Sequence, residues 1–165
     1  MWAVPGPGQT GSMASPPEIS IRPARPVDLA RIVEILGHGS LRPDQEDPTD
    51  LAPYAAALAE IDAGPGDVLV AELDGTVVGL FQLIVFRHLQ HRGGRCAEIE
   101  SMHVHPDHRA RGIGAVLLAA AVERARAAGC FRVQLTSNKA RVDAHRFYLR
   151  HGFEESHEGF KLLLE

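Results

Sequence analysis

The sequence has few of the residues that mark several large classes of protein. It contains only two cysteines in 165 residues, Cys96 and Cys130, which excludes a disulfide framework and favours reduced thiols. No apolar run approaches the ~20 residues that span a bilayer. A formal net charge of −4 gives no overall attraction to nucleic acid or to an anionic membrane surface. We therefore expect a cytoplasmic protein whose partners include neither nucleic acid nor membrane.

The first 17 residues have the composition of a tail. They are rich in glycine, proline and serine, and they lack both the basic start and the apolar centre of a signal peptide. The chain as a whole, with 45% hydrophobic and 23% charged residues, has the composition of a soluble globular protein of one domain. We predict a disordered tail over residues 1–17 and a single domain over residues 18–165.

Hydrophobic periodicity predicts a succession of strands and helices. The clearest unit is a β-hairpin over residues 67–86, because two strand-like runs flank Asp74-Gly75, the pair typical of a type I′ turn. The other expected elements are strands at 18–24, 96–105 and 131–137, helices at 25–37, 50–64, 112–128 and 140–152, and one or two closing strands in 153–165. This order indicates an α+β domain with a mixed sheet and about four helices.

Residues 109–114, Arg-Ala-Arg-Gly-Ile-Gly, place positive charge and little side chain where a helix begins. The first N–H groups of a helix have no internal partner, and together with the helix dipole they bind phosphate. Two glycines would let a phosphate approach the backbone, and two arginines would add charge-assisted hydrogen bonds. A dinucleotide-binding turn is a weaker interpretation, because Leu117 stands where its third glycine would be. A tight turn with solvated arginines is the remaining alternative.

Three segments, in this order, resemble the GCN5-related N-acetyltransferases. Residues 109–114 fit the family's coenzyme A pattern Arg/Gln-x-x-Gly-x-Gly/Ala, the strand 131–137 follows, and residues 138–153 match Asn…Ala-x-x-Phe-Tyr-x-x-x-Gly-Phe. The resemblance covers about residues 18–165. It implies a mostly antiparallel mixed sheet with a V-shaped splay between the fourth and fifth strands. It also implies acetyl transfer from acetyl-CoA to a primary amine, by direct attack through a tetrahedral intermediate.

The resemblance further implies where the donor binds. Backbone N–H groups of residues 109–115 would hold the pyrophosphate of acetyl-CoA, and the pantetheine arm would lie in the splay like an added strand. The donor-binding residues expected on this basis are Met102, His103, Val104, Arg109, Ala110, Arg111, Gly112, Ile113, Gly114, Ala115, Asn138, Ala144 and Phe147.

The chemistry needs a base and an acid. An amine attacks only when neutral, so a base should stand near the acetyl group. Glu98 and Glu100 share one face of their strand, and their positions resemble those of the family's general base and of a substrate-contacting carboxylate. Tyr148 occupies the family's position for the acid that protonates the leaving thiolate. A surface carboxylate and a packing tyrosine are the structural alternatives.

Nine histidines raise the question of a metal. His103 and His105 should share a strand face, but we expect this face to point away from the one that carries Glu98. No third carboxylate or cysteine follows a metal-ligand spacing here. We therefore expect no metal cofactor.

The acceptor is the least determined part of the reaction. The C-terminal third, and more loosely the loop 87–95, are similar to aminoalkylphosphonate N-acetyltransferases, which favours a small-molecule amine with an anionic end. The candidate substrate residues are Tyr54, Arg87, His88 and Arg95. Acetylation of protein lysines or N termini is the main enzymatic alternative, and a non-catalytic coenzyme A-binding sensor is the alternative of another class. We expect a monomer or a homodimer.

Overall fold

Five strands form one sheet in the order β1-β2-β3-β4-β5. The computed structural model describes residues 19–164, so the tail predicted over residues 1–17 lies outside the described residues. β2 pairs with β1 and β3, and β3 with β4, in antiparallel fashion, whereas β4 and β5 are parallel. The strands are β1 (Ile19–Pro23), β2 (Gly66–Leu73), β3 (Thr76–Arg87), β4 (Arg95–Val104) and β5 (Cys130–Leu135). The predicted α+β class with a mostly antiparallel mixed sheet is confirmed.

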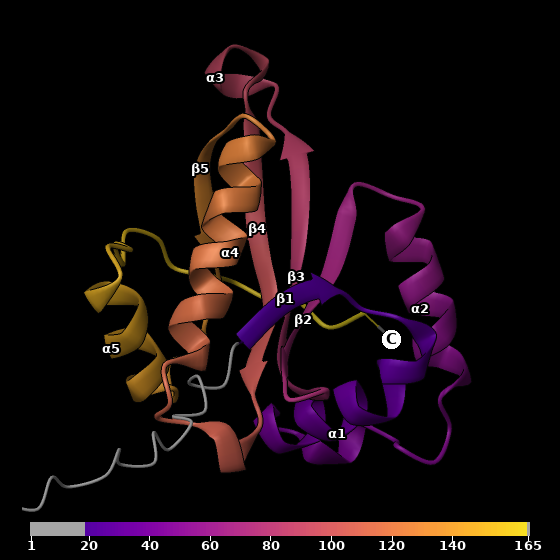
Figure 1. Ribbon diagram of the computed structural model, residues 1–165. Coiled ribbons are helices and arrows are strands. Elements are labelled where there is room, and N and C mark those ends of the chain that lie inside the picture. The colour runs from indigo at the N-terminus through magenta and orange to yellow at the C-terminus, as the bar shows by residue number, and fades with distance from the viewer. Residues whose placement is uncertain (1–18, 165) are drawn as a thin grey trace, which may run out of the picture.

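Helices cover both faces of this sheet (Figure 1). α1 (Leu29–Gly39) and α2 (Ala52–Asp62) pack on one face, and α4 (Ile113–Ala127) packs on the other. α5 (Val142–Arg150) stands beside the first turn of α4, and the short α3 (Gln90–Gly93) lies at the tip of the β3–β4 hairpin. Within residues 19–164, no helix combines the length and the apolar character needed to cross a membrane.

The core has two parts, one on each side of the sheet. Phe81 and Leu83 of β3 belong to the cluster under α4, whereas Leu80 belongs to the cluster under α1 and α2. This division follows from the strand, because successive side chains point to opposite faces. Phe81 is fully buried, and burial of such a side chain contributes roughly 1.5–3 kcal/mol.

The predicted hairpin and its turn are confirmed. Asp74 has a φ of 50° and Gly75 a φ of 77°, so both central residues lie in the left-handed region, as a type I′ turn requires. The turn holds β2 against β3 with Leu73 opposite Thr76.

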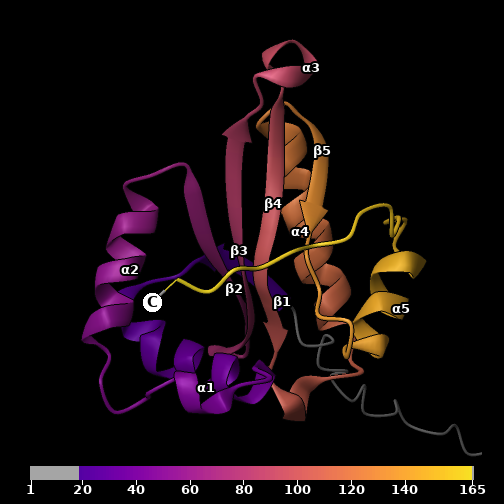
Figure 2. The same ribbon diagram turned by 180° about the vertical axis from the view of Figure 1, so that it is seen from behind.

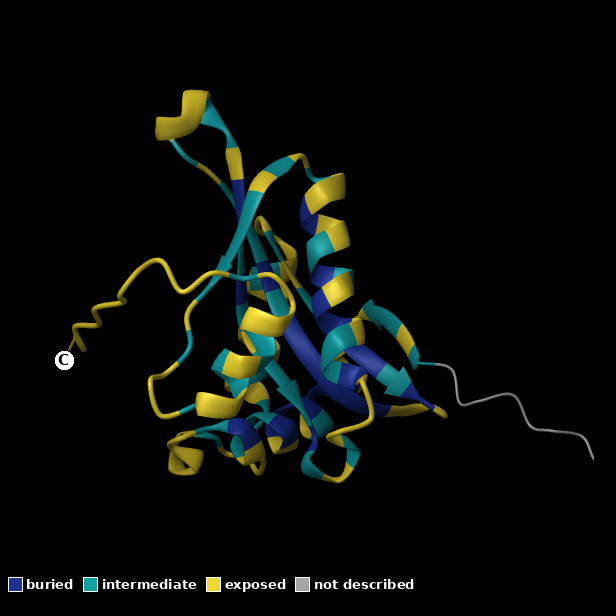
Figure 3. Ribbon diagram, turned by 90° about the vertical axis from the view of Figure 1, so that its left-hand side faces the viewer, coloured by how far each residue is buried: buried dark blue, intermediate teal, exposed yellow. Residues whose placement is uncertain are grey.

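The closing strands predicted in residues 153–165 are wrong, because residues 153–164 contain no strand. This segment leaves α5 and overlaps the sheet in the view of Figure 2, but the turned view of Figure 3 shows that it extends away from the sheet and is almost wholly exposed. A segment that extends away from the sheet has no neighbouring strand with which to form a ladder of hydrogen bonds. Its glutamates and Gly159 also have low strand propensity.

The splay between β4 and β5 begins at a β-bulge. The β4–β5 register ends with Ile99 opposite Leu135, although β4 continues to Val104. In β4, Ser101 has a φ of 51°, and the pairing with β3 shifts register at this point. An extra residue in one strand bends it. The predicted V-shaped splay is confirmed, and the bulge marks where the two strands part.

Candidate active site

The loop that enters α4 has the backbone of an anion site. Ala110 has a φ of 58° and Gly112 a φ of 80°, and Gly112 is the residue that caps the helix start. Left-handed residues in a short loop turn N–H groups to one side and form a concave anion-binding surface. A residue with a Cβ loses about 1 kcal/mol or more of stability in the left-handed region. The surrounding structure must therefore hold Ala110 in this conformation. The first turn of α4 adds its own unpaired N–H groups.

Two arginines flank this backbone. Arg109 Nε donates to the carbonyl oxygen of Val104 at 3.2 Å, and Arg111 Nη1 lies 3.1 Å from His108 Nδ1. Both arginines are exposed, whereas Ile113 is buried in the core, so only the backbone N–H of Ile113 is left for a ligand. Cationic groups and a helix start both favour an anion at this place.

Other predicted donor residues lie on β4 beyond its pairing with β5, just after β5, and on α5. Phe147 of α5 lies beside Gly114, since a Cβ on Gly114 would come within 3.5 Å of its ring. Met102 and Val104 are half-buried on the side of the sheet that faces α4, and Ala144 is half-buried on α5. Asn138 is exposed, and its Oδ1 accepts the N–H of Ala140 at 2.9 Å, so its NH₂ group is the part free for a ligand.

Ser137 is a residue that the sequence analysis missed. Its Oγ is buried and has no hydrogen-bond partner among residues 19–164. A buried hydroxyl without a partner costs about 1–3 kcal/mol. Ser137 comes soon after β5 ends at Leu135, where the splay opens. A ligand with amide groups in the splay, such as a pantetheine arm, would satisfy this hydroxyl, so the residues present fit coenzyme A. A serine directly before the predicted Asn138 was the available signal.

Glu98 and Glu100 share one face of β4, as predicted. In the β3–β4 register they lie opposite Ile84 and Gln82. The side-chain amide of Gln134 on β5 donates to Glu98 Oε2. Burial raises the pKa of Glu100, the nearby Glu98 raises that pKa further, and Lys161 of the C-terminal segment partly opposes both effects.

The predicted orientation of the histidines is wrong. His103 lies opposite Leu80 while Glu100 lies opposite Gln82, and two residues of β3 that are two apart share a face. His103 is therefore on the same face as Glu100, because the bulge at Ser101 inserts one residue and reverses the alternation. Burial lowers the pKa of His103 to about 4, with Arg141 and Arg109 contributing, so this histidine is neutral at pH 7.

Tyr148 lies on α5, half-buried between aromatic neighbours. Its ring is 5.3 Å from that of Phe147 and 5.7 Å from that of Phe153, measured between centroids. Burial raises the pKa of Tyr148, an effect that the charge of Arg141 partly offsets. The phenol therefore keeps its proton at neutral pH and is available as an acid.

The four predicted substrate residues do not form one cluster. The Tyr54 hydroxyl donates to Glu46 Oε2 and accepts the N–H of Asp47, both at 2.9 Å, and so fastens the loop before α2. The other three lie at the tip of the β3–β4 hairpin, away from α2 (Figure 1). There they bond to their surroundings: Arg87 to the carbonyl of Gly93, Arg95 to the carbonyl of Ala128, and His88 to Arg132.

A cavity of about 270 Å³ lies between α2 and the strands β2 and β3. Its lining includes Ile61, Gln82 and Ile84. Because Gln82 and Ile84 pair directly with Glu100 and Glu98, the cavity lies on the face that carries both carboxylates. Gln82 was also missed, although it is the only polar residue in the apolar run 77–86.

Comparison with known proteins identifies the family of this fold and site. Residues 29–153 match the acetyltransferase (GNAT) family. The chain belongs to this family. It is 45% identical over 87 residues to the aminoalkylphosphonate N-acetyltransferase of Salmonella typhimurium (strain LT2), a match that covers 53% of this chain and 56% of that protein. This chain thus spans about half the length of that relative.

A longer match to an acetyltransferase supports the assignment to the GNAT family, and a solved structure shares the fold. The chain is 34% identical over 142 residues to the aminoglycoside N(6')-acetyltransferase type 1 of Stenotrophomonas maltophilia, covering 83% of this chain and 87% of that protein. Among solved structures, the transcriptional regulator from Bacillus halodurans C-125 superposes with a TM-score of 0.84 at 35% identity, covering 89% of this chain and all of that one. The match to the GNAT family ends at Phe153, so it leaves out the exposed segment 154–164.

Proposed function

We propose that this GNAT protein transfers an acetyl group from acetyl-CoA to the primary amine of a small molecule. The observation that carries the proposal is a splay with an anion site at its open end and a carboxylate of raised pKa, Glu100, on one of its strands. Donor and acceptor then meet from opposite faces of β4. The donor lies between β4 and β5, and the acceptor lies on the side of α1 and α2.

Residues on both sides of the splay would hold the donor. The N–H groups of residues 109–115 would bind its pyrophosphate, with Arg109 and Arg111 beside them. Ser137 and Asn138 would bond to the amides of its pantetheine arm, which would satisfy the buried Ser137 hydroxyl. Acetyl-CoA supplies the acetyl group as a thioester.

Glu100 is the general base of the proposal. The amine nitrogen forms a bond to the acetyl carbon, the carbon–sulfur bond breaks, and the proton of the amine passes to the Glu100 carboxylate, directly or through water. A pKa raised toward neutrality makes a carboxylate a stronger base. Glu98, held by Gln134, maintains this pKa through its charge. Tyr148 would give its proton to the departing thiolate, and an N–H between Met102 and Val104 would bond to the carbonyl oxygen.

The acceptor would enter by the cavity beside α2. Glu98 and Glu100 give this face a negative charge, which attracts an ammonium group before it loses its proton. The likeness to proteins named for aminoalkylphosphonates and aminoglycosides supports a small polar amine. An anionic end of such a substrate would have to reach the hairpin tip, where Arg87 and Arg95 are cationic and His88 offers an imidazole.

Two measurements test the proposal in sequence. Acetyl-CoA at 100 times its Kd should stabilise the protein by about 2.7 kcal/mol, a rise in Tm of roughly 5–10 °C for a domain of this size. A panel of aminoalkylphosphonates, aminoglycosides, polyamines, amino acids and peptides is then scored by release of free thiol. Thiol release with a small amine supports the proposal. A Tm shift without turnover of any amine would favour a coenzyme A sensor, and turnover of peptides alone would favour protein acetylation.

A further inference from the structure

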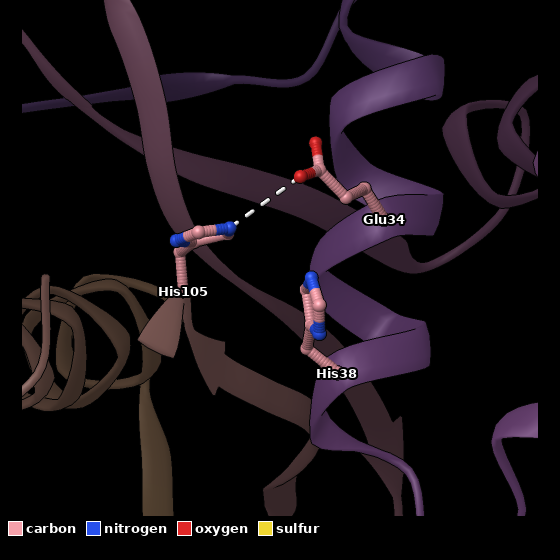
Figure 4. A group of neighbouring side chains, drawn as sticks. All are labelled: Glu34, His38 and His105. Carbon is pink, nitrogen blue, oxygen red and sulfur yellow. Dashed lines mark ion pairs between the residues drawn. The ribbon is translucent and has the colours of Figure 1, made fainter. Parts of the chain in front are cut away.

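Three side chains outside the acetyl-transfer site converge where α1 meets the end of β4 (Figure 4). Glu34 and His38 lie one turn apart on the same face of α1, and His105 directly follows β4. Each offers one ligand atom, and these atoms all lie within 4.8 Å of one another. His105 Nε2 is 3.5 Å from Glu34 Oε1.

His105 is the buried member of this cluster. Its side chain is only 7% exposed, and its Nε2 has no hydrogen-bond partner within the described part of the chain. The same atom points at Glu34, as Figure 4 shows. Its nearest partner is the Glu34 carboxylate, at the outer limit of hydrogen-bond length, so this contact satisfies the buried nitrogen only weakly. The fold therefore holds a weakly satisfied nitrogen toward a carboxylate and a second imidazole.

We propose that Glu34, His38 and His105 bind one divalent cation of the Zn²⁺, Co²⁺ or Ni²⁺ class. Two imidazoles and a carboxylate are the donors that these ions prefer, whereas Mg²⁺ and Ca²⁺ prefer oxygen ligands. Two ligand atoms on a tetrahedral ion with bonds of ~2.0–2.1 Å lie about 3.4 Å apart, which agrees with the 3.5 Å between His105 and Glu34. His38 is exposed, so its ring is free to turn and complete the set.

Neighbouring residues prepare two of the ligands. Arg31 Nη1 donates to Glu34 Oε2 at 2.7 Å, which leaves Oε1 for the ion. On the other side of the His105 ring, Nδ1 accepts a hydrogen bond from the backbone N–H of Asp107 at 3.3 Å, and Asp107 Oδ2 lies 3.8 Å away. When Nε2 binds an ion, the proton is on Nδ1, so Nδ1 gives up this backbone bond and turns to the Asp107 carboxylate, a common support for a metal-bound histidine.

The bound ion would link the two halves of the molecule. α1 packs on the acceptor side of the sheet, whereas His105 directly precedes the loop that leads to the anion site of α4. A cation held by both would fix α1 against that loop. The site itself involves no residue proposed for acetyl transfer, so it stands or falls independently of the proposed function.

Metal binding is tested on the full chain after treatment with EDTA. Addition of Zn²⁺ should raise the Tm, and addition of Co²⁺ should produce the visible absorption of a low-coordinate site with one ion per chain. Glu34→Gln and His38→Ala change exposed side chains, so both variants should fold. Each should weaken Co²⁺ binding at least tenfold, and Asp107→Asn should weaken it by roughly 10–100-fold.

His157→Ala is the matched control, because it removes an exposed histidine of the C-terminal segment. It should leave the Co²⁺ titration unchanged. The proposal is overturned if Co²⁺ gives no absorption in the native chain. It is equally overturned if Glu34→Gln and His38→Ala both bind Co²⁺ like the native protein, because the ion then binds elsewhere, for instance at His88 and His91 in the hairpin tip. A cooperative thermal unfolding transition like that of the native chain shows that the variants are folded.

Discussion

The two sides of β4 differ in charge and in the part of the chain that provides it. On the side of β5 and α4, backbone N–H groups meet Arg109 and Arg111, a place for an anion. On the side of α1 and α2, Glu98 and Glu100 lie next to the cavity, a place for a cation. One strand thus separates the sites proposed for a negatively charged donor and a positively charged acceptor.

The two sides also differ in construction. The anion site of the donor side depends on backbone conformation within one continuous segment, residues 109–115, so a change in conformation or bulk there should abolish binding. The acceptor side depends on single side chains supplied by separate elements, so replacing one should change the chemistry and spare donor binding. Mutations that separate the two effects test this contrast.

Glu100→Gln should have the largest effect on turnover. Loss of a general base costs about 10²–10⁴-fold in rate, while the Tm shift with acetyl-CoA should stay as it is. The raised pKa means that the folded state resists ionisation of Glu100, so its contribution to stability falls as pH rises from the unfolded-state pKa through the folded-state pKa. The variant should therefore be no less stable than the native protein at pH 7, as thermal unfolding will show.

Glu123→Gln, on the exposed surface of α4, is the control for Glu100→Gln. It should keep native turnover. If Glu100→Gln kept more than a tenth of the native rate, Glu100 would not be the base.

Gly112→Trp should abolish donor binding. Gly112 has a φ of 80°, which a side chain tolerates poorly, and the indole would cover the N–H groups at the helix start. We expect at least a ~100-fold loss of affinity for acetyl-CoA, about 2.8 kcal/mol at ~1.4 kcal/mol per tenfold. Gly159→Trp is the matched control, because Gly159 lies in open space within the C-terminal segment. Equal Tm shifts with acetyl-CoA in both variants would remove the anion site from α4.

Tyr148→Phe should have a smaller effect on turnover than Glu100→Gln. The ring and its packing against Phe147 and Phe153 remain, and only the proton donor is lost. Because a thiolate leaves more readily than an alkoxide, we expect a loss of ~10²-fold in kcat, at the low end for acid–base groups. Acetyl-CoA binding, followed by Tm, should not change. Native kcat in this variant would make Tyr148 a packing residue.

The contrast between the two sides also explains what the sequence could predict. The anion site of the donor side is local. Two arginines, Gly112 and an amphipathic helix follow one another in the sequence, and the unpaired N–H groups of a helix start favour an anion there. The acceptor side depends on register. A single positive φ at Ser101 turned His103 to the face of Glu100, and no periodicity predicts a bulge at a serine.

Contacts between residues far apart in the chain could not be predicted either, because no local sequence pattern encodes them. The carboxylate and the second imidazole beside His105 come from α1, Glu34 and His38, about 70 residues earlier in the chain. The four-residue spacing of Glu34 and His38 predicts that they share a helix face, but it does not predict that His105 lies beside them. The prediction of closing strands was wrong because the leucine-rich composition of this end favours a strand, whereas the segment extends away from the sheet and is exposed.

Glu98→Gln should change the pH profile more than the maximal rate. The Glu98 carboxylate raises the pKa of Glu100, so removing its charge should lower that pKa. The acid limb of kcat/KM, which reports ionisation of the base in the free enzyme, should therefore move to lower pH. The substituted side chain keeps the size of the original, and its amide oxygen can still accept from Gln134, so the strand pairing should remain. A limb that stayed in place would show that Glu100 does not set the profile. A limb that moved to higher pH would contradict the charge coupling between the two carboxylates.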